Sequence, residues 1–199
     1  MVSCILLAAG LSSRFSSPKA LAKFGEITVI EQLQGLLVDT QLFEIIIVLG
    51  ARADDIKPFL LKHKKIKVVY NKDYNLGQTS SFKVGLESVS PAGQGVMMLP
   101  VDYPFLKKET IDSIFEKFMS YPSPIFMIPT YQGKKGHPPI FHAAFKEEFQ
   151  VLDNALGLNT VASHHLDKTV LLPVDDLGVI STFNTQEEFL NLKKIFGRS

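Results

Sequence analysis

The strongest constraint on this chain is a regular alternation of short apolar runs with segments that have helical spacing. The apolar runs are bounded by turn residues, as buried strands are, and cover residues 2–8, 44–49, 65–70, 95–99 and 125–128, with weaker runs at 169–173 and 179–182. Helical spacing covers residues 29–38, 53–62, 80–88, 108–119, 143–149 and 186–196. This alternation predicts a three-layer α/β fold with a mostly parallel sheet, and a ligand site beyond the carboxyl ends of its strands.

Composition narrows the class of protein. A chain of 199 residues with no internal repeat and no long linker is expected to form a single domain over residues 1–199. Its 21 lysines and arginines nearly balance its 20 aspartates and glutamates, so no broad positive surface for nucleic acid is expected. No apolar run is long enough to predict a membrane span. The one cysteine, Cys4, cannot form an internal disulfide, which favours a core position and a cytoplasmic location.

The most informative segment joins the first predicted strand to a turn of small residues. The turn through Gly10 allows the backbone to approach a triphosphate closely, and free amides as far as Ser13 can donate to its oxygens. Arg14 and Lys19 add cationic donors that offset charge on the phosphates during transfer. The segment matches neither GxxxxGK[ST] nor GxGxxG, so neither a P-loop nor an ordinary dinucleotide site is indicated. The nucleotide-binding residues predicted here are Leu7, Ala8, Ala9, Gly10, Leu11, Ser12, Ser13, Arg14 and Lys19.

A resemblance to a known family begins in this same segment. The run LLAAGLSSRF, followed by PKALAKFG, resembles the signature LxAAGxSxRMGxxK of the MobA-like nucleotidyltransferases, and in particular their molybdenum cofactor cytidylyltransferase branch. Further matching runs follow in order along nearly the whole chain: NKDY at 71–74, GQTSSFKVGL at 77–86, DYPFL at 102–106 and GHPPIF at 136–141. The chain departs from the family at Ser16, at Val101 and at TFNTQ (182–186), which replaces Asp-Ile-Asp-Thr-Pro and lacks its two carboxylates.

The resemblance implies a fold and a reaction. The fold is a single-domain, Rossmann-like three-layer nucleotidyltransferase fold with a mostly parallel, mixed sheet. The reaction is magnesium-dependent transfer of CMP from CTP to molybdopterin cofactor with release of pyrophosphate, and a molybdoenzyme is implied as a transient partner. Because the attacking phosphate is already ionised near neutral pH, alignment and charge neutralisation matter more than a general base. Arg14, Lys19 and Asp102 are therefore the predicted catalytic residues.

The segment that begins at Gly77 is predicted to contact the nucleobase. Its glycine turn leads into a predicted helix whose early serines are also suited to capping backbone amides. The resemblance places Gly77, Ser80 and Ser81 beside the base or ribose, with Lys83 close by and Asn71 among the nucleotide-binding residues. Cytosine specificity comes from the resemblance alone.

Asp102 and Asn184 are the predicted magnesium ligands. Asp102 follows the apolar run 95–99 and so lies at the carboxyl end of a predicted central strand, where a hard oxygen donor suits magnesium. The alternative role for Asp102 is to form the turn before Tyr103 and Pro104. Asn184 keeps a neutral oxygen where the family usually has a carboxylate, and its alternative is to cap the last helix. His137 and Pro138, in the constrained GHPP turn, are predicted to position the acceptor. Zinc binding is disfavoured because no paired Cys or His spacing accompanies His137.

Other functions remain open from the residues. One is transfer of another nucleotide, including GMP to molybdopterin or a nucleotidyl group to a sugar phosphate. Another is a noncatalytic molybdenum cofactor carrier or maturation chaperone, which the missing late carboxylates would fit. An NAD-dependent oxidoreductase is disfavoured because the dinucleotide fingerprint and its following acidic residue are absent.

Overall fold

A computed structural model describes residues 1–15 and 17–197 of the chain. The departure from the family signature at Ser16 therefore lies outside the described residues. The strands are β1 (Val2–Ala8), β2 (Lys23–Phe24), β3 (Ile27–Thr28), β4 (Glu44–Leu49), β5 (Ile66–Tyr70), β6 (Gly95–Pro100), β7 (Phe126–Tyr131), β8 (Lys134–Lys135), β9 (Ile140–His142) and β10 (Thr169–Pro173). The helices are α1 (Val29–Val38), α2 (Ala53–Ile56), α3 (Gln78–Glu87), α4 (Lys108–Met119), α5 (Lys146–Val151), α6 (Asn159–Ser163) and α7 (Gln186–Ile195).

The main sheet is mixed but mostly parallel, as the sequence predicts. Within the described residues it has eight strands in the order β10-β7-β9-β6-β1-β4-β5, with β8 paired to β7. β1 pairs in parallel with both β4 and β6, and β10 pairs in parallel with β7, whereas β9 runs antiparallel to its neighbours β6 and β7. The chain leaves β1 toward β4 and returns to β6 on the opposite side. The carboxyl ends of β1 and β6 thus form a topological switch point, where α/β sheets usually bind their ligands.

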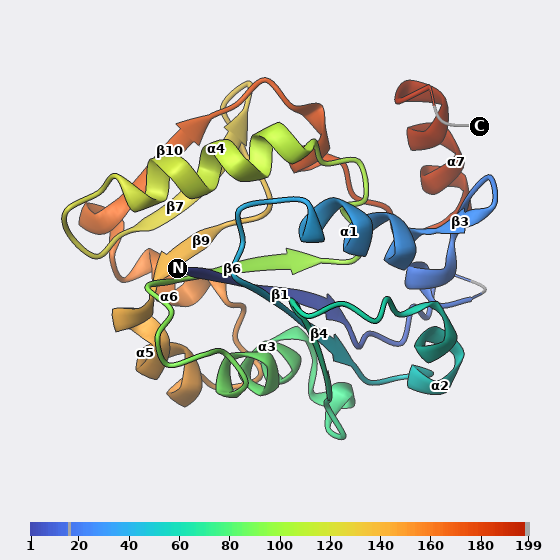
Figure 1. The fold of residues 1–199 in the computed structure, drawn as a ribbon, viewed down its shortest axis with the longest axis horizontal. Coiled ribbons are helices and arrows are strands. Elements are labelled where there is room, and N and C mark those ends of the chain that lie inside the picture. Colours follow the sequence, from blue (N-terminus) through green and yellow to red (C-terminus); the bar gives the residue numbers. More distant parts are fainter. Residues whose placement is uncertain (16, 198–199) are drawn as a thin grey trace.

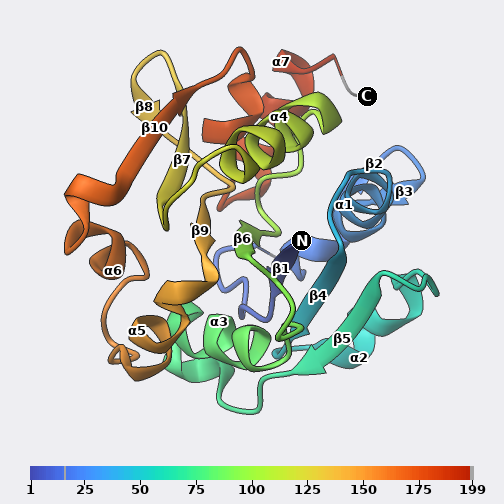
Figure 2. The same cartoon turned by 60° about the vertical axis from the view of Figure 1, so that its left-hand side comes forward.

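Helices cover both faces of the sheet (Figures 1 and 2). Helices α1, α4 and α7 lie on one face, and α3, α5 and α6 lie on the other. Side chains alternate along β1 accordingly: Cys4 and Leu6 pack on the first face, and Ile5 and Leu7 on the second. Cys4 is fully buried, and burial raises the pKa of its thiol to about 12, which fits a core residue. No helix among residues 1–15 and 17–197 is long and apolar enough to cross a bilayer.

Most predicted elements form close to where the sequence places them, and three differ. The helix predicted over residues 143–149 begins as a 3-10 helix over Ala143–Phe145 and is α-helical over Lys146–Val151. The helix predicted over residues 53–62 ends at Ile56 and continues as a 3-10 helix over Lys57–Phe59, because Pro58 cannot donate the next helical hydrogen bond. The strand predicted over residues 179–182 is wrong: Leu177–Ile180 forms a 3-10 helix. The buried carboxylate of Asp176 imposes this turn, since it accepts hydrogen bonds from the Gly178 amide at 2.8 Å and from the Lys107 amide at 2.9 Å.

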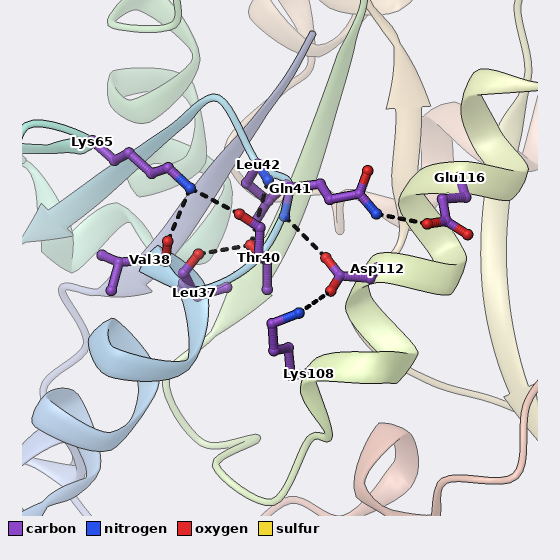
Figure 3. Close-up of polar contacts among 9 residues, drawn as sticks. All are labelled: Leu37, Val38, Thr40, Gln41, Leu42, Lys65, Lys108, Asp112 and Glu116. Atoms are coloured by element: carbon purple, nitrogen blue, oxygen red, sulfur yellow. Dashed lines mark hydrogen bonds and ion pairs between the residues drawn. The ribbon is translucent and has the colours of Figure 1, made fainter.

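A polar network joins the end of α1 to α4 across the chain entering β4 (Figure 3). Lys65 Nζ donates to the carbonyls of Val38 and Thr40 at 2.9 and 2.8 Å, which satisfies acceptors left free where the helix ends. The Gln41 amide donates to Asp112 of α4 at 2.9 Å. Lys65 therefore stabilises the end of α1.

Candidate active site

The loop after β1 presents backbone amides at the switch point. β1 ends at Ala8, and Ser12 adopts a left-handed conformation with φ of 52°. The Ser12 carbonyl accepts from the Phe15 amide at 2.8 Å, and its hydroxyl accepts from the Lys19 amide at 3.0 Å, so both ends of the turn are fixed. The amides at positions 10–13 donate to no described residue and are available to an anionic ligand.

An aromatic cluster brings the C-terminal segment to this loop. Phe15, at the end of the turn, packs against Phe183 with ring centroids 5.5 Å apart, and Phe183 packs against Phe189 of α7 at 4.7 Å. Phe183 is fully buried. Because Phe183 is anchored in this way, the next side chain, Asn184, is held at the mouth of the loop despite its distance along the chain.

Lys19 joins the two predicted metal ligands. Its Nζ donates to Asp102 Oδ2 at 2.9 Å and to Asn184 Oδ1 at 3.0 Å, and Arg14 donates to the same Asn184 oxygen at 3.2 Å. The side chains of Lys19 and Asp102 are only 15% and 21% exposed, so water screens this pair less than a surface ion pair. These hydrogen bonds join all four predicted side chains of the transfer centre into one network.

The N-terminus of α3 forms the opposite side of the site. Gly77 precedes the helix with φ of 98°, a conformation that favours glycine. Asn71, which follows β5, is buried, and its side-chain Nδ2 donates to the hydroxyls of Ser80 and Ser81 at 2.9 and 3.0 Å. Its side-chain oxygen Oδ1 accepts from the Asp73 amide at 2.9 Å. Asn71 thereby fixes the first turn of α3 against the end of the sheet.

These elements enclose a pocket of about 370 Å³, called here the first pocket. That volume is in the range of small-molecule sites, roughly 300–1,000 Å³. Most of the predicted nucleotide, catalytic and metal residues line it: Leu7, Ala8, Ala9, Gly10, Leu11, Ser12, Ser13, Arg14, Lys19, Gly77, Ser81, Asp102 and Asn184. Residues of motifs that are far apart in the sequence thus line one cavity.

Three predicted nucleotide-binding residues do not line the first pocket. Lys83 points away from it, and its ammonium donates to the Leu152 carbonyl at the end of α5. Asn71 and Ser80 are buried, and the Ser80 hydroxyl bonds to Asn71 and to the carbonyls of Asp73 and Gly77. Because their polar groups already have protein partners, Asn71 and Ser80 support the residues that line the pocket and do not line it themselves. Lys83 instead joins α3 to the end of α5.

His137 lines a second pocket, of about 320 Å³, between the sheet and helices α3, α5 and α6. The peptide bond before Pro138 is cis, and the His137 amide donates to the Val179 carbonyl at 2.7 Å, which holds the turn. Burial lowers the pKa of His137, and the Asp102 carboxylate and the Met98 carbonyl oppose that effect only in part. Pro138 itself is buried and lines neither pocket.

Sequence reasoning missed several lining residues. Tyr74 and Asn75 line the first pocket, Tyr103 lines the second, and Gln78 lines both. Their signal was present, because each lies in or next to a motif that the sequence already singled out. What the sequence lacked was the direction of each side chain, which depends on how the loops pack.

The oxygen donors at the switch point fit magnesium, the metal that the resemblance implies. Magnesium prefers hard oxygen ligands and commonly takes one or two protein side chains, with the rest supplied by phosphates and water. Asp102 and Asn184 offer one carboxylate and one amide oxygen, close enough that the single ammonium of Lys19 touches both. Among the described residues there is no group of three or more His, Cys, Asp or Glu side chains suited to a metal.

A Rossmann-like mixed sheet with a cationic, amide-lined pocket at its switch point is the arrangement of a nucleotide-binding protein. The comparison with family models specifies it further: the chain belongs to the family described as MobA-like NTP transferase domain, whose model matches residues 4–169. This confirms the resemblance in the sequence motifs.

Individual proteins show the same likeness. The molybdenum cofactor cytidylyltransferase of Escherichia coli K12 is 29% identical over 144 residues, which cover 69% of this chain and 68% of that protein. A nucleotidyl transferase from Methanothermobacter thermautotroptrophicus superimposes with a TM-score of 0.82 and 19% identity, covering 98% of this chain and 97% of the other. Rv0371C from Mycobacterium tuberculosis H37Rv, in complex with manganese, gives a TM-score of 0.77 and 22% identity, covering 97% and 98%. At these identities the two structures show a shared fold.

Proposed function

We propose that this protein transfers CMP from CTP to molybdopterin cofactor in a magnesium-dependent reaction that releases pyrophosphate. Family membership establishes the nucleotidyltransferase class. The similarity to the molybdenum cofactor cytidylyltransferase of Escherichia coli supports the cytidylyl group and the molybdopterin acceptor. The observation that carries the proposal is the convergence of Lys19, Asp102 and Asn184 at the mouth of the amide-lined loop.

The loop after β1 binds the triphosphate in this proposal. Its amides at positions 10–13, which donate to no described residue, donate to phosphate oxygens, and Arg14 and Lys19 reach the same space with two positive charges. Charge builds up on the leaving pyrophosphate as the bond to the α-phosphate breaks. Donors that are already held in place stabilise that charge without reorganising, which is the main electrostatic contribution to such a step.

Asp102 and Asn184 hold the metal in this proposal. When bound there, magnesium supplies Lewis-acid neutralisation of phosphate charge. Arg14 and Lys19 both contact the Asn184 amide oxygen, so they keep that side chain directed at the site. The amide in place of a family carboxylate leaves Asp102 as the one anionic donor of the pair.

The acceptor attacks the α-phosphate through a terminal phosphate oxygen that needs no deprotonation near neutral pH. The protein's task is therefore to align the two substrates. His137 lies in the second pocket, which shares Gln78 with the first, so an acceptor held there is next to the nucleotide site. We also propose that the protein works in the cytoplasm and passes its product to a molybdoenzyme.

The test is incubation of the purified protein with molybdopterin cofactor, magnesium and CTP, GTP or ATP separately. Pyrophosphate and the nucleotidylated product are measured together. We expect CTP to be preferred in kcat/KM by about tenfold or more, because a site that reads hydrogen-bonding edges rejects mismatched bases. Equal efficiency for the three nucleotides would remove the cytidylyl assignment and leave nucleotidyl transfer standing. Binding of CTP without turnover would favour the carrier function instead.

A further inference from the structure

Asp176 is a buried carboxylate that lines neither pocket. It is only 1% exposed, and both of its oxygens accept hydrogen bonds from the protein. Oδ2 accepts from the Lys107 amide at 2.9 Å and from the Thr110 hydroxyl at 2.8 Å, and Oδ1 accepts from the Gly178 amide at 2.8 Å. A carboxylate suits this place because it accepts at both oxygens, whereas an amide side chain accepts at one end and donates at the other. Asp176 therefore ties its own segment to the first turn of α4.

The turn that follows this carboxylate also holds the segment before β9. The Val179 carbonyl accepts from the His137 amide at 2.7 Å. Two glycines allow the close approach: a Cβ on Gly178 would lie 2.4 Å from the Phe105 carbonyl oxygen, and one on Gly136 would lie 2.3 Å from the Val179 carbonyl oxygen. Three segments are therefore packed backbone against backbone beside the carboxylate: 102–107, 136–137 and 176–184.

Each of these three segments carries one residue of the proposed site: Asp102, His137 and Asn184. The described residues of the loop after β1 and of the N-terminus of α3 make no hydrogen bond to the Asp176 carboxylate. The carboxylate thus sets the positions of the two metal donors and of His137 relative to one another, without contact with the sides of the site proposed for triphosphate and base.

We propose that Asp176 is a positioning residue for nucleotidyl transfer, because its carboxylate locks the segment that carries Asp102 against the segment that carries Asn184. This inference rests on the proposed function, which assigns the metal to these two side chains. A displacement of about 1 Å, caused by a change far from the reacting atoms, can slow a reaction by roughly a hundredfold. A side chain that lines neither pocket can therefore control the rate of transfer.

The experiment weakens this junction at two places. Asp176→Asn keeps the size of the side chain but turns an NH₂ group toward a backbone N–H that now donates to the carboxylate. Thr110→Val keeps the shape of the buried threonine and removes only the hydroxyl that donates to Asp176. Thr110→Ser keeps the hydroxyl, so it is the conservative variant that should restore function.

Thr40→Val is the matched control for Thr110→Val. The Thr40 side chain is also buried, and its hydroxyl donates to the Leu37 carbonyl at 2.6 Å. Thr40 lies shortly before β4 begins, at the opposite end of the sheet from the proposed site. The same isosteric change therefore removes a buried hydrogen bond without touching the junction at Asp176.

Three quantities are measured for each variant. They are kcat and the KM for CTP with molybdopterin cofactor and magnesium, the urea midpoint of unfolding, and the affinity of the nucleotide-free protein for manganese by electron paramagnetic resonance. Kinetics are run under conditions in which circular dichroism shows each variant to be folded. Manganese binding needs neither CTP nor acceptor, so it reports on the metal donors independently of turnover.

We expect kcat to fall at least about tenfold in Asp176→Asn and about threefold in Thr110→Val, with the KM for CTP within about threefold of wild type in both. Manganese should bind Asp176→Asn several-fold more weakly, because the two donors are no longer held together. Thr110→Ser and Thr40→Val should keep kcat within about twofold, although Thr40→Val should unfold at a lower urea concentration.

A wild-type kcat in folded Asp176→Asn, or a loss of kcat in Thr40→Val as large as that in Thr110→Val, would overturn the inference. If Asp176→Asn does not fold, equal kcat in Thr110→Val and Thr110→Ser would overturn it. Weaker manganese binding in Asp176→Asn, with no CMP transfer by the wild type, would contradict the proposed function alone. CMP transfer by the wild type, with both kcat and manganese affinity unchanged in Asp176→Asn, would contradict the inference alone.

Discussion

The ammonium of Lys19 lies 2.9 Å from the carboxylate of Asp102, and the same ammonium contacts the Asn184 oxygen at 3.0 Å. One positive charge thus already holds the two oxygen donors proposed for the metal. Lys19 must leave at least part of this arrangement when a divalent cation binds, and the triphosphate is the natural new partner for its charge. In the proposed mechanism, metal binding and nucleotide binding are therefore linked through Lys19.

Lys19→Met tests this link. Removing the ammonium removes a competitor for Asp102 and Asn184, so we expect manganese to bind the nucleotide-free variant roughly tenfold more tightly than wild type. Turnover should nevertheless fall by roughly a hundredfold, because the phosphates lose a cationic donor. Free manganese is measured by electron paramagnetic resonance, with the exposed Lys23→Met as the control. Unchanged or weaker manganese binding in Lys19→Met would show that the ammonium does not compete for this site.

Asp102 and Asn184 should differ in importance. Asp102→Ala removes the charged donor of the pair, and we expect turnover to fall by roughly a thousandfold. Asn184→Asp restores a carboxylate, so it should keep turnover and need no more magnesium than wild type. Turnover across a magnesium titration separates the two variants. A magnesium dependence that is unchanged in Asp102→Ala would place the metal elsewhere.

Ser80 and Ser81 are neighbours with different expected roles. Ser81 lines the first pocket, so Ser81→Ala should raise the KM for CTP several-fold. The buried Ser80 hydroxyl instead bonds within the protein, so Ser80→Ala should lower the free energy of unfolding by about 1 kcal/mol with little change in KM. Steady-state kinetics and urea unfolding of both variants test this contrast. A larger KM effect from Ser80→Ala would place Ser80 in contact with the nucleotide.

His137 should make stability depend on pH. Because burial lowers its pKa in the folded protein, the unfolded chain takes up this proton first as the pH falls. The His137 contribution to the free energy of unfolding is complete above the unfolded pKa of about 6.5 and is lost as the pH falls through the lower folded pKa. In urea unfolding between pH 7.5 and 5, His137→Gln should lose less stability than wild type. Equal losses in the two proteins would contradict the lowered pKa of His137 in the folded protein.

Lys65 should stabilise the end of α1 (Figure 3). Lys65→Met removes two hydrogen bonds to the carbonyls of Val38 and Thr40, and we expect the free energy of unfolding to fall by about 1 kcal/mol. The adjacent, exposed Lys64→Met is the matched control and should change it little. Chemical denaturation of the three proteins provides the measurement. A loss of equal size in Lys64→Met would point to net charge as the cause.

The fold was predictable because its signals are local and strong. The runs that became β1, α1, β4 and α4 have clear apolar periods and clear turn residues at both ends, so even their bounds agree with the structure. The segment 179–182 has an apolar run too, but its conformation depends on Asp176 and its partners Lys107 and Thr110 on distant parts of the chain. Periodicity contains no information about such contacts.

The same distinction holds for the site. The loop from Gly10 to Arg14 and Lys19 was found because its residues are consecutive and their chemistry is suited to phosphate. The direction of Lys83 toward Leu152 could not be predicted from the sequence, since a lysine six residues after Gly77 gives no indication of which face of the helix it occupies until α5 is placed. The position of Asn184 depends on Phe15 and Phe183 packing together across most of the chain.

The most direct test of nucleotidyl transfer follows the label from CTP. The purified protein is incubated with molybdopterin cofactor, magnesium and CTP labelled with ³²P at either the α or the γ phosphate. Attack at the α-phosphate predicts that the α label appears in the acceptor product and the γ label in pyrophosphate, and that Asp102→Ala produces little of either. Transfer of the γ label to the acceptor, or no labelled acceptor from either nucleotide, would contradict the account.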